Sequence, residues 1–570
     1  MNRKTKAPNE RGIFTFRNIA LIAFGLSGMT ALIYEVVWAR MLSLIFGSTV
    51  YAVATMLTAF MAGLALGSYL MGKRCDEVED LPLYFGLFEL GIGIYGILFI
   101  LALGYVQYPY FFLYKILHAH FWLFILAQFL LYFLVLLVPT TMFGAIFPIV
   151  SKIFTQNMDE LGKDIGYVYA VNSFGSVIGP FLAGFILIPI VGIKNTALFA
   201  ASVNMLLAFI ILRFSSLKEE GKFFLPIMFA FLLIGSQAMI PPMLINAWFV
   251  GAFPDIAAAE ETLEDVDVLF YREGPYSTVT VVHTLGYIGL KSDGRGEAST
   301  LPEDLRHQFL LAYIPMLLHK NPEKVLDIGV GAGFTLGAIE NFDSKQIDAV
   351  EIDPAILEAS EKFFSRFNND ALNDPRIRIF TTDGRNYLLM TEGKYDVIVS
   401  APSHPLTSGV SHLFTKEFFE LSKAHLNEDG IYCQWVPGHR FSPEEHKIVV
   451  KTFTSVFPHT ILWINNVDAL NDSSQMVDSF LIGSMHPIEI DRERICEIVN
   501  ENEKIKGDLD TIGVDSADEF FSLMILDEGG VVSYAADEDR LNTDDFPIIE
   551  FQAPKSLLED SVVRLSDIMS

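Results

Sequence analysis

Residues Val325–Gly333 read VLDIGVGAG, a short apolar strand that runs directly into a glycine-rich turn. About twenty residues further on, Ala349–Asp353 read AVEID, which predicts a second strand ending at an acidic residue. Glycines let the backbone of a strand-to-helix turn approach a ligand closely, and a carboxylate at the end of the next strand can accept hydrogen bonds from both ribose hydroxyls. Glu351 is that carboxylate, and the pair of motifs predicts a nucleoside-binding site.

The spacing of the turn distinguishes two kinds of nucleoside site. A nicotinamide dinucleotide site favours G-x-G-x-x-G, with a helix N-terminus facing a pyrophosphate. Here the turn carries Asp327, Gly329, Gly331 and Gly333, followed by Phe334. This run resembles motif I of the class I S-adenosylmethionine-binding fold, so we expect these four residues to bind the cofactor.

Short apolar strands alternate with helical stretches after the glycine turn, which favours a parallel sheet with crossover helices. Ligands in such sheets bind at the carboxyl ends of the strands. Asp383 and Gly384 follow the third strand, and Asp383 could accept a hydrogen bond from an adenine amino group or simply belong to a turn. The predicted strands are Val325–Gly329, Ile347–Asp353, Ile377–Gly384, Tyr395–Ser400 and Gly430–Val436.

The charges are distributed unevenly along the chain. Residues 1–250 carry 15 Lys+Arg and 12 Asp+Glu, whereas residues 251–570 carry 25 and 56, giving about +3 and −31 and recovering the total of −28. A near-neutral apolar half therefore precedes an acidic soluble half. So strong an acidic excess disfavours nucleic acid as a partner. It would attract small amines, although a solvated, solubilising surface explains it equally well.

The first half contains apolar runs of the length that crosses a bilayer, about 20 residues in a helix. The alternative is a set of core helices in a soluble protein. Lys and Arg before the first run, after the second, after the fourth and after the sixth fit a cytoplasmic N-terminus. We expect a multi-pass protein of the bacterial inner membrane, in contact with lipid, with spans near 17–45, 50–72, 83–104, 121–150, 166–190, 195–213 and 222–241.

An odd number of spans would place the acidic half outside the cell, where S-adenosyl cofactors are not normally supplied. The number of spans becomes even if residues 121–155 form two segments broken at Pro139, or if Pro241–Pro254 is a short re-entrant or interfacial piece. We expect a cytoplasmic soluble domain on the ground of cofactor supply.

Polar residues inside the apolar runs suggest either pairing between helices or a substrate or proton path. They are Glu35, Arg40, Glu89 and Asn172. Small residues such as Gly67 and Gly175 indicate close helix packing. The three cysteines and twelve histidines show no metal-ligand spacing, so we expect no metal site.

Several collinear segments resemble the spermidine synthase family, specifically its membrane-fused branch. In the soluble half they are REGPYSTVTVV from Arg272, the run from Pro302 to Gly333, AVEIDPAILEAS, DPRIRIFTTDGRNYLL, the run from Tyr395 to Val436, and LNTDDFPIIEF, which resembles the family's closing strand. SGMTALIYEVVWARMLSLIFGSTVYAV and YAVNSFGSVIGPFLAGF resemble the transporter-like half of that branch. The resemblance implies transfer of an aminopropyl group from decarboxylated S-adenosylmethionine to an amine, releasing methylthioadenosine.

Residue by residue, the resemblance matches Glu351 to the ribose-binding carboxylate and Asp383 to the adenine-side one. Tyr276 matches a family tyrosine near the reacting atoms, so we treat it as a candidate catalytic residue. Asp293 and Glu297 fall near the acceptor side and are candidate amine-binding residues.

The chain departs from the family where the amine should bind. Ala332 stands in place of the aspartate that holds the aminopropyl ammonium, and Ala401 and His404 replace the two aspartates of the catalytic D-S-S-D-P stretch. Ser277 replaces the glutamine after the tyrosine. His404 could replace the missing base, because imidazole accepts a proton near neutral pH, or it could be an ordinary loop histidine.

Three functions follow from these residues: an integral-membrane aminopropyltransferase, a methyltransferase that uses intact S-adenosylmethionine, and a sensor or transporter that binds ligand without turnover. We leave open whether the chain forms a homodimer. The expected fold is a polytopic α-helical membrane domain followed by an α/β Rossmann-like domain with a small β region. The predicted boundaries are 1–16 for a basic tail, 17–245 for seven or eight membrane helices, 255–320 for the β-rich part, 321–485 for the nucleoside-binding domain and 486–570 for an acidic extension.

Overall fold

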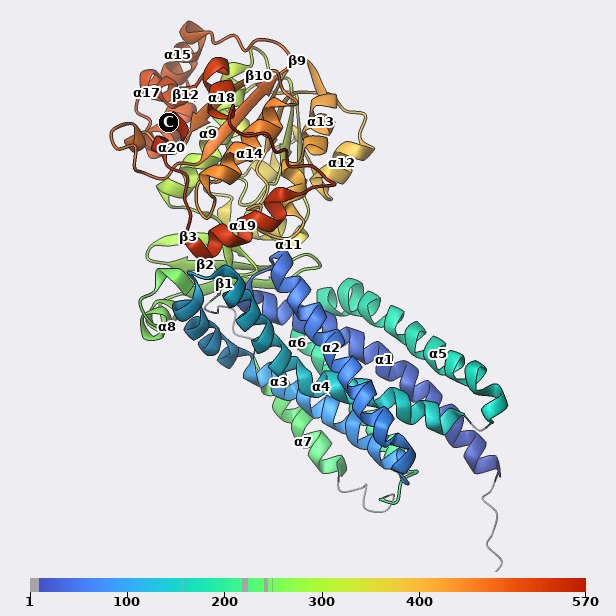
Figure 1. Cartoon of the computed structure of the whole chain (residues 1–570). Helices are drawn as coiled ribbons and strands as arrows, with labels where there is room; N and C mark the ends of the chain where they lie inside the picture. Colours follow the sequence, from blue (N-terminus) through green and yellow to red (C-terminus); the bar gives the residue numbers. More distant parts are fainter. Residues whose placement is uncertain (1–9, 156, 218–223, 240–243, 245, 249) are drawn as a thin grey trace, which may run out of the picture. The chain divides into compact units, whose positions relative to one another are not determined.

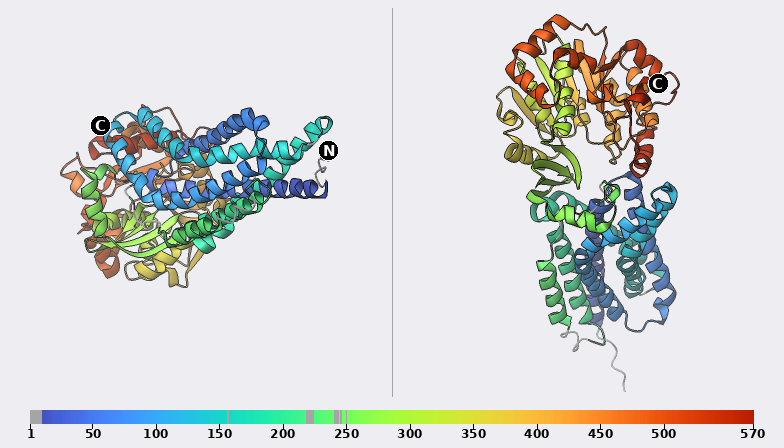
Figure 2. Two further views of the ribbon diagram at one scale, coloured as in Figure 1. Left: turned by 90° about the horizontal axis from the view of Figure 1, so that it is seen from below. Right: turned by 90° about the vertical axis from the view of Figure 1, so that its left-hand side faces the viewer.

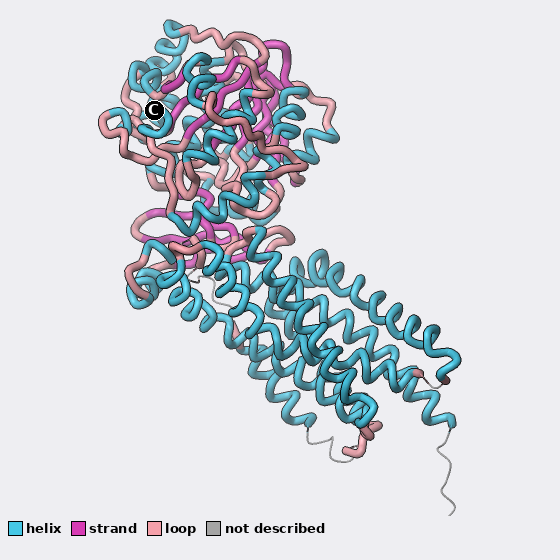
Figure 3. The backbone as a smooth tube through the Cα atoms, viewed as in Figure 1, coloured by secondary structure: helices cyan, strands magenta, loops and turns pink. Residues whose placement is uncertain are grey.

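A computed structural model of the chain describes residues 10–155, 157–217, 224–239, 244, 246–248 and 250–570. It divides into two compact units, residues 1–47 with 51–247, and residues 48–50 with 248–570. The basic residues at positions 3, 4, 6, 218 and 222, and part of Pro241–Pro254, lie outside the described residues. Strands occur within the second unit in the described chain, beginning at Asp267 (Figure 3).

The first unit is helical, and its helices run side by side (Figures 1 and 2). Five helical stretches are long and apolar enough to cross a membrane, by length and composition; the shorter apolar helix α7 has 14 residues. Each predicted span overlaps a helix of this unit, in which the described residues form seven α-helices. They are α1 Glu10–Phe46, α2 Val50–Arg74, α3 Leu81–Leu117, α4 Phe121–Phe154, α5 Leu161–Phe181, α6 Ile188–Leu212 and α7 Phe224–Gln237.

Two expectations about breaks in these helices have different outcomes. Helix α4 continues through Pro139, so the proposed division of residues 121–155 is wrong. The gap left between the spans 166–190 and 195–213 corresponds to a real kink, because Gly192 has φ 83° and ψ 168° inside α6. Glycine adopts this conformation without the steric cost that a Cβ would add.

Small residues let the helices approach closely, as the sequence predicts. A side chain on Gly175 of α5 would overlap the backbone of Gly25 on α1, and one on Gly67 of α2 would overlap Thr141 of α4. Buried polar groups pair between helices. Asn204 of α6 donates a 2.6 Å hydrogen bond to Glu89 of α3.

The second unit begins with α8 (Ile256–Glu264) and a four-stranded antiparallel sheet in the order β1-β2-β3-β4. Its strands are β1 Asp267–Glu273, β2 Thr278–Thr284, β3 Tyr287–Ser292 and β4 Arg295–Ser299. Helix α9 (Pro302–Leu318) follows, and residues 308–318 of it are buried. After α9 the chain enters the large sheet.

The large sheet has eight strands in the order β12-β10-β11-β9-β8-β5-β6-β7. The five predicted strands are β5 Lys324–Ile328, β6 Gln346–Glu351, β7 Ile377–Thr381, β8 Tyr395–Ser400 and β9 Leu426–Val436, and they pair in parallel. The sheet is nevertheless mixed, because β10 (His459–Ile464), β11 (Ser479–Ser484) and β12 (Met524–Leu526) extend it antiparallel. Its crossover helices are α10 Phe334–Ile339, α11 Pro354–Ala359, α12 Gly384–Met390, α13 Lys416–Ala424 and α14 Pro443–Thr454.

The segment predicted as a separate acidic extension, residues 486–570, packs within the second unit. It supplies β12 and the helices α15 Arg492–Glu501, α16 Glu503–Thr511, α17 Ala517–Ser522, α18 Glu528–Tyr534, α19 Ile548–Glu559 and α20 Leu565–Met569. LNTDDFPIIEF is not a strand, since its last four residues begin α19. The buried side chain of Asn542 instead donates to the carbonyl of Phe414, which ties this segment to the region before α13.

Candidate active site

A cavity of about 760 Å³ opens at the carboxyl ends of the parallel strands of the second unit. Each of β5, β6, β7, β8 and β9 contributes residues within three positions of its carboxyl end. A cavity of this volume can hold a nucleoside together with a small second substrate. The place is the one the sequence predicts for a ligand in a parallel sheet.

The glycine turn forms part of the cavity wall. Gly329 has φ 95° and Gly331 has φ 55°, in the left-handed region that favours glycine. A Cβ on Gly329 would overlap the carbonyl oxygen of Ala401, so this close approach also requires glycine. Gly333 does not line the cavity; a Cβ there would lie 2.7 Å from Nδ2 of Asn368, which makes its role one of packing.

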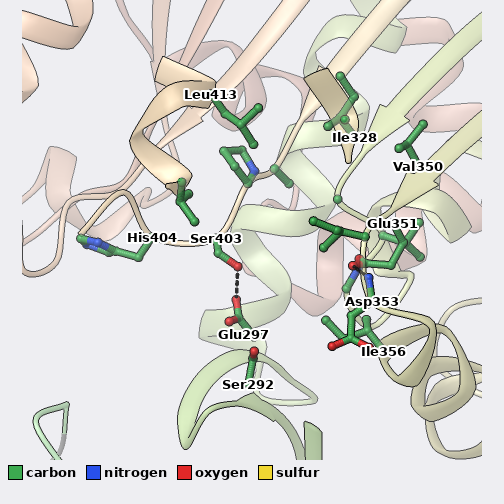
Figure 4. A pocket seen from close by; sticks show the side chains of 18 of the residues that line it. Ser292, Glu297, Ile328, Val350, Glu351, Asp353, Ile356, Ser403, His404 and Leu413 are labelled. Carbon is green, nitrogen blue, oxygen red and sulfur yellow. Dashed lines mark hydrogen bonds between the residues drawn. The ribbon is translucent and has the colours of Figure 1, made fainter. Parts of the chain in front are cut away.

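Glu351 ends β6 and projects into the cavity (Figure 4). Its Oε2 accepts a hydrogen bond from the Gly331 amide at 3.2 Å, and its Oε1 accepts one from the Asp353 amide at 3.0 Å. Each carboxylate oxygen therefore keeps a lone pair for a ligand hydroxyl. Burial, with the charges of Asp353 and Glu297, raises the pKa of Glu351 to about 7 despite these two amide hydrogen bonds.

Asp327 lies behind the glycine turn, fully buried, and is not among the described residues that line the cavity. Neither of its carboxylate oxygens has a hydrogen-bond partner among the described residues. Burial, together with the charge of Glu351, raises the pKa of Asp327 to about 8. The structure therefore gives Asp327 no direct contact with a ligand in this cavity, contrary to the sequence prediction.

This buried carboxyl predicts a pH dependence of stability. A group whose pKa is raised from 3.8 to about 8 on folding stabilises the fold at low pH, and this contribution is lost as the pH rises to 8. We expect the thermal midpoint of the wild type to fall by several degrees between pH 5 and 8, and Asp327→Asn to flatten that slope. The matched control is Asp343→Asn at an exposed position. An unchanged slope in Asp327→Asn would contradict the assignment.

Asp383 and Gly384 also line the cavity, at the end of β7. Asp383 caps α12, and its Oδ1 accepts the Asn386 amide at 2.8 Å, which leaves Oδ2 for a ligand. Arg385 next to it binds Asp544 through both guanidinium NH groups. Asp383 therefore has the turn role considered in the sequence analysis, and it also lines the cavity.

Glu297 lies in the middle of β4, the last strand of the small sheet, and lines the same cavity. Ser403 donates a 3.1 Å hydrogen bond to its Oε2 (Figure 4). Its Oε1 accepts from Arg295, whose guanidinium also contacts Thr407 and lies 5.3 Å from the ring centroid of Trp248. Asp293 does not line the cavity and instead accepts the Thr278 amide through Oδ1. Of the two predicted amine-side acids, only Glu297 lies in the cavity.

Tyr276 lies at the cavity with 56% of its surface exposed, so its ring is accessible to a ligand. Next to it, the amide and hydroxyl of Ser277 both donate to Oδ2 of Asp353, which also lines the cavity. Asp353 is thereby fixed, since its Oδ1 also accepts the Ala355 amide.

The role of a catalytic base predicted for His404 does not fit its contacts. Nε2 of His404 lies 2.9 Å from the carbonyl oxygen of His439, and its Nδ1 accepts the Leu406 amide at 3.3 Å. Both ring nitrogens are thus occupied by the backbone, which fixes the neutral tautomer with Nε2 protonated. Burial lowers the pKa of His404 well below its usual value. Figure 4 shows its ring pointing away from Glu351 and Glu297.

Sequence reasoning missed several cavity residues. Arg295 is an ordinary residue type at the start of β4 and carries no motif, whereas Ser403 lies in the stretch after β8 that was compared with D-S-S-D-P. His307, Trp435 and His439 also line the cavity. His439 follows the carboxyl end of β9, and the strand-end rule applied to the other strands would have identified it.

The chain is similar in sequence to several known proteins. A family model described as the spermine/spermidine synthase domain matches residues 304–467. The polyamine aminopropyltransferase of Bacillus mycoides (strain KBAB4) is 33% identical over 210 residues, 36% of this chain and 74% of that protein. Polyamine aminopropyltransferase 2 of Aquifex aeolicus (strain VF5) is 25% identical over 409 residues, 71% of this chain and 76% of that protein. A spermidine synthase structure from Thermotoga maritima covers 47% of this chain and 87% of its own, with 23% identity and a TM-score of 0.39.

The similarity is not confined to the second unit. The 409 residues matched to the Aquifex protein exceed the 323 residues from Trp248 to Ser570, so the likeness extends into the helical unit. The Bacillus relative combines its identity with coverage of most of its length. The chain belongs to the spermidine synthase (polyamine aminopropyltransferase) family.

Proposed function

We propose that this protein transfers the aminopropyl group of decarboxylated S-adenosylmethionine to a small amine. The observation that carries the proposal is the presence of two carboxylates in one cavity, the buried Glu351 and Glu297, whose side chain is 14% exposed. One serves ribose and the other serves an ammonium, so the two substrates would meet between them. The relatives named above are polyamine aminopropyltransferases, which supports the reaction class.

The nucleoside would lie against Glu351, Asp383 and the glycine turn. Glu351 would accept hydrogen bonds from the ribose hydroxyls, for which each of its oxygens keeps a lone pair. Ile352 and Ile356 provide apolar surface for the adenine ring. Oδ2 of Asp383 would accept from the adenine amino group.

The amine would lie against Glu297. An ammonium donates to carboxylates in charge-assisted hydrogen bonds that contribute about 1.5–3 kcal/mol each. Arg295 already occupies Oε1 of Glu297, so this carboxylate attracts a cation less strongly than a free one would. Two catalytic aspartates of the family are replaced by Ala401 and His404, and Asp304 is a further acid at this side. The site thus favours an acceptor with fewer positive charges than a diammonium.

The reaction needs positioning more than activation, because the sulfonium is already a good leaving group. The cavity would hold the attacking nitrogen in line with the methylene carbon next to sulfur, which replaces a bimolecular encounter by an oriented one. Tyr276 is placed to contact either substrate at this point.

We also propose that the helical unit lies in the bilayer, as an anchor of the catalytic unit in the cell membrane. Its five long apolar stretches support this placement. A cytoplasmic catalytic unit would have direct access to the S-adenosyl substrate.

Product identity tests the proposal. The full chain in detergent, given decarboxylated S-adenosylmethionine and a panel of mono-, di- and amino-acid amines, is expected to release methylthioadenosine. The same assay with intact S-adenosylmethionine is expected to yield no S-adenosylhomocysteine. The reverse result would favour a methyltransferase, which Ala332 in place of an aminopropyl-binding acid would suit. Release of neither product would indicate a binding protein without turnover.

A further inference from the structure

One histidine of the cavity has the arrangement that a catalytic base requires. We propose that His439 removes the proton from the attacking amine, with Asp478 as its positioning carboxylate. The proposal rests on the proposed function and adds the base that Ala401 and His404 do not supply. His439 follows β9 at the carboxyl edge of the sheet, and its side chain is 43% exposed.

Asp478 is a buried carboxylate that its own hydrogen bonds hold in place beside this histidine. It precedes β11 and is 5% exposed, its Oδ1 accepts the Gly438 amide at 2.7 Å, and its Oδ2 accepts the indole of Trp435 at 3.3 Å. Burial alone would raise its pKa, but His439, the nearby His307 and the Gly438 amide lower the pKa of Asp478 to about 2. It is therefore a fixed negative charge in the pH range of catalysis.

The contact between the two side chains orients the imidazole. Nδ1 of His439 lies 3.7 Å from Oδ1 of Asp478. A carboxylate on this side favours the tautomer with a proton on Nδ1, which leaves a lone pair on Nε2. The same charge stabilises the imidazolium that forms when Nε2 takes a proton. Contacts of this length often tighten when substrate binds.

The other histidines of the cavity are less suited. His404 uses both ring nitrogens on the backbone. The ring of His307 lies 5.9 Å from that of Trp435, tilted by 30°, and in the described chain no carboxylate lies within 4.0 Å of its ring nitrogens. His412 has Asp544 at 3.9 Å, but that carboxylate is held by Arg385 next to Asp383, on the nucleoside side. Of these cavity histidines, His439 combines a fixed carboxylate with a place beside the loop after β8, since its ring centroid lies 5.2 Å from that of His404.

Proton transfer to His439 precedes formation of the new carbon–nitrogen bond. Nε2 of His439 takes one proton from the acceptor ammonium and becomes part of an imidazolium, which leaves a neutral amine with a free electron pair. That pair forms the new bond to the methylene carbon next to sulfur. The carbon–sulfur bond breaks, and its electrons neutralise the sulfonium to give the thioether methylthioadenosine. The proton on His439 then passes to solvent.

The test compares His439→Gln with the wild type in the full chain, using decarboxylated S-adenosylmethionine and the amine that gives the highest turnover. We expect kcat to fall roughly 100- to 10,000-fold, the range for a lost acid–base group, while the affinity for methylthioadenosine changes less than twofold. Asp478→Asn is expected to lower kcat less and to move the acid limb of its pH profile to lower pH, because the imidazolium loses its counter-charge. His459→Gln is the matched control, since His459 pairs with Glu528 at 3.0 Å outside the cavity.

Each other outcome overturns the assignment in a distinguishable way. Wild-type turnover with an equally active His439→Gln would reject the base and leave the proposed function standing. A His439→Gln protein that also loses methylthioadenosine affinity would show a structural role only. A wild type that releases no methylthioadenosine with any amine would reject the proposed function, and the base with it.

Discussion

Glu351→Gln is expected to weaken binding of methylthioadenosine and of decarboxylated S-adenosylmethionine by about 100-fold or more. The two ribose hydroxyls donate to this carboxylate in our proposal, and each charge-assisted hydrogen bond is worth about 1.5–3 kcal/mol. Glutamine presents only one acceptor oxygen, and its NH2 group would face the amide of Gly331 or Asp353. The loss therefore combines weaker ligand bonds with a disturbed turn.

Calorimetric titration of the full-length protein measures this effect, with Glu361→Gln as the control because Glu361 is an exposed glutamate on the segment after α11. Since the pKa of Glu351 is raised to about 7, its carboxylate form is scarce in the free protein below that pH. Wild-type affinity should therefore increase between pH 6 and 8, with proton release on binding at pH 6. An affinity in Glu351→Gln equal to that of the wild type would remove the nucleoside from this end of the cavity.

Glu297→Gln is expected to raise KM for the amine about 10- to 100-fold, with nucleoside affinity preserved. The substitution removes the negative charge that faces the acceptor and leaves the cation of Arg295 beside it. An ammonium would then meet repulsion instead of attraction. The change also removes the partner of a guanidinium with only 9% of its side chain exposed, which costs stability.

Steady-state kinetics at saturating decarboxylated S-adenosylmethionine separates the two effects. Methylthioadenosine titration first shows whether the variant remains folded at the nucleoside end, and Arg295→Met with Glu297→Gln restores neutrality if it does not. Glu303→Gln, at an exposed position on α9, is the control. If KM for every amine stays at the wild-type value, Glu297 has no part in acceptor binding.

The order of elements in the sheet could be predicted from the sequence because each parallel strand is a continuous apolar run followed by a turn. The strand predicted at Tyr395–Ser400 agrees with β8 at both ends. The antiparallel strands β10, β11 and β12 were not predicted, since their pairing partners are distant in the sequence and no turn motif joins them. LNTDDFPIIEF was assigned to a strand by resemblance, but its context here begins a helix.

For the site too, the sequence predicted the residues whose roles are set locally and not those brought together from distant segments. Glu351 and Gly329 could be predicted because their roles are local, set by one strand and one turn. The rest of the cavity lining comes in part from β4, the loop after β8 and the loop after β9, so its members carry no common spacing. His404 was a reasonable candidate by residue type alone, and only the contacts of its two ring nitrogens show that it is unsuitable.

The antiparallel part of the large sheet also decides how the chain tolerates shortening. β12 comes from residues 524–526, and it covers the outer edge of β10. A chain ending at residue 485 would expose the unpaired N–H and C=O groups of that edge, together with the buried ring of Trp463. Open apolar edges pair with strands of other molecules. We therefore expect the C-terminal helices and their short strand to protect the chain against self-association, a task unconnected with the cavity.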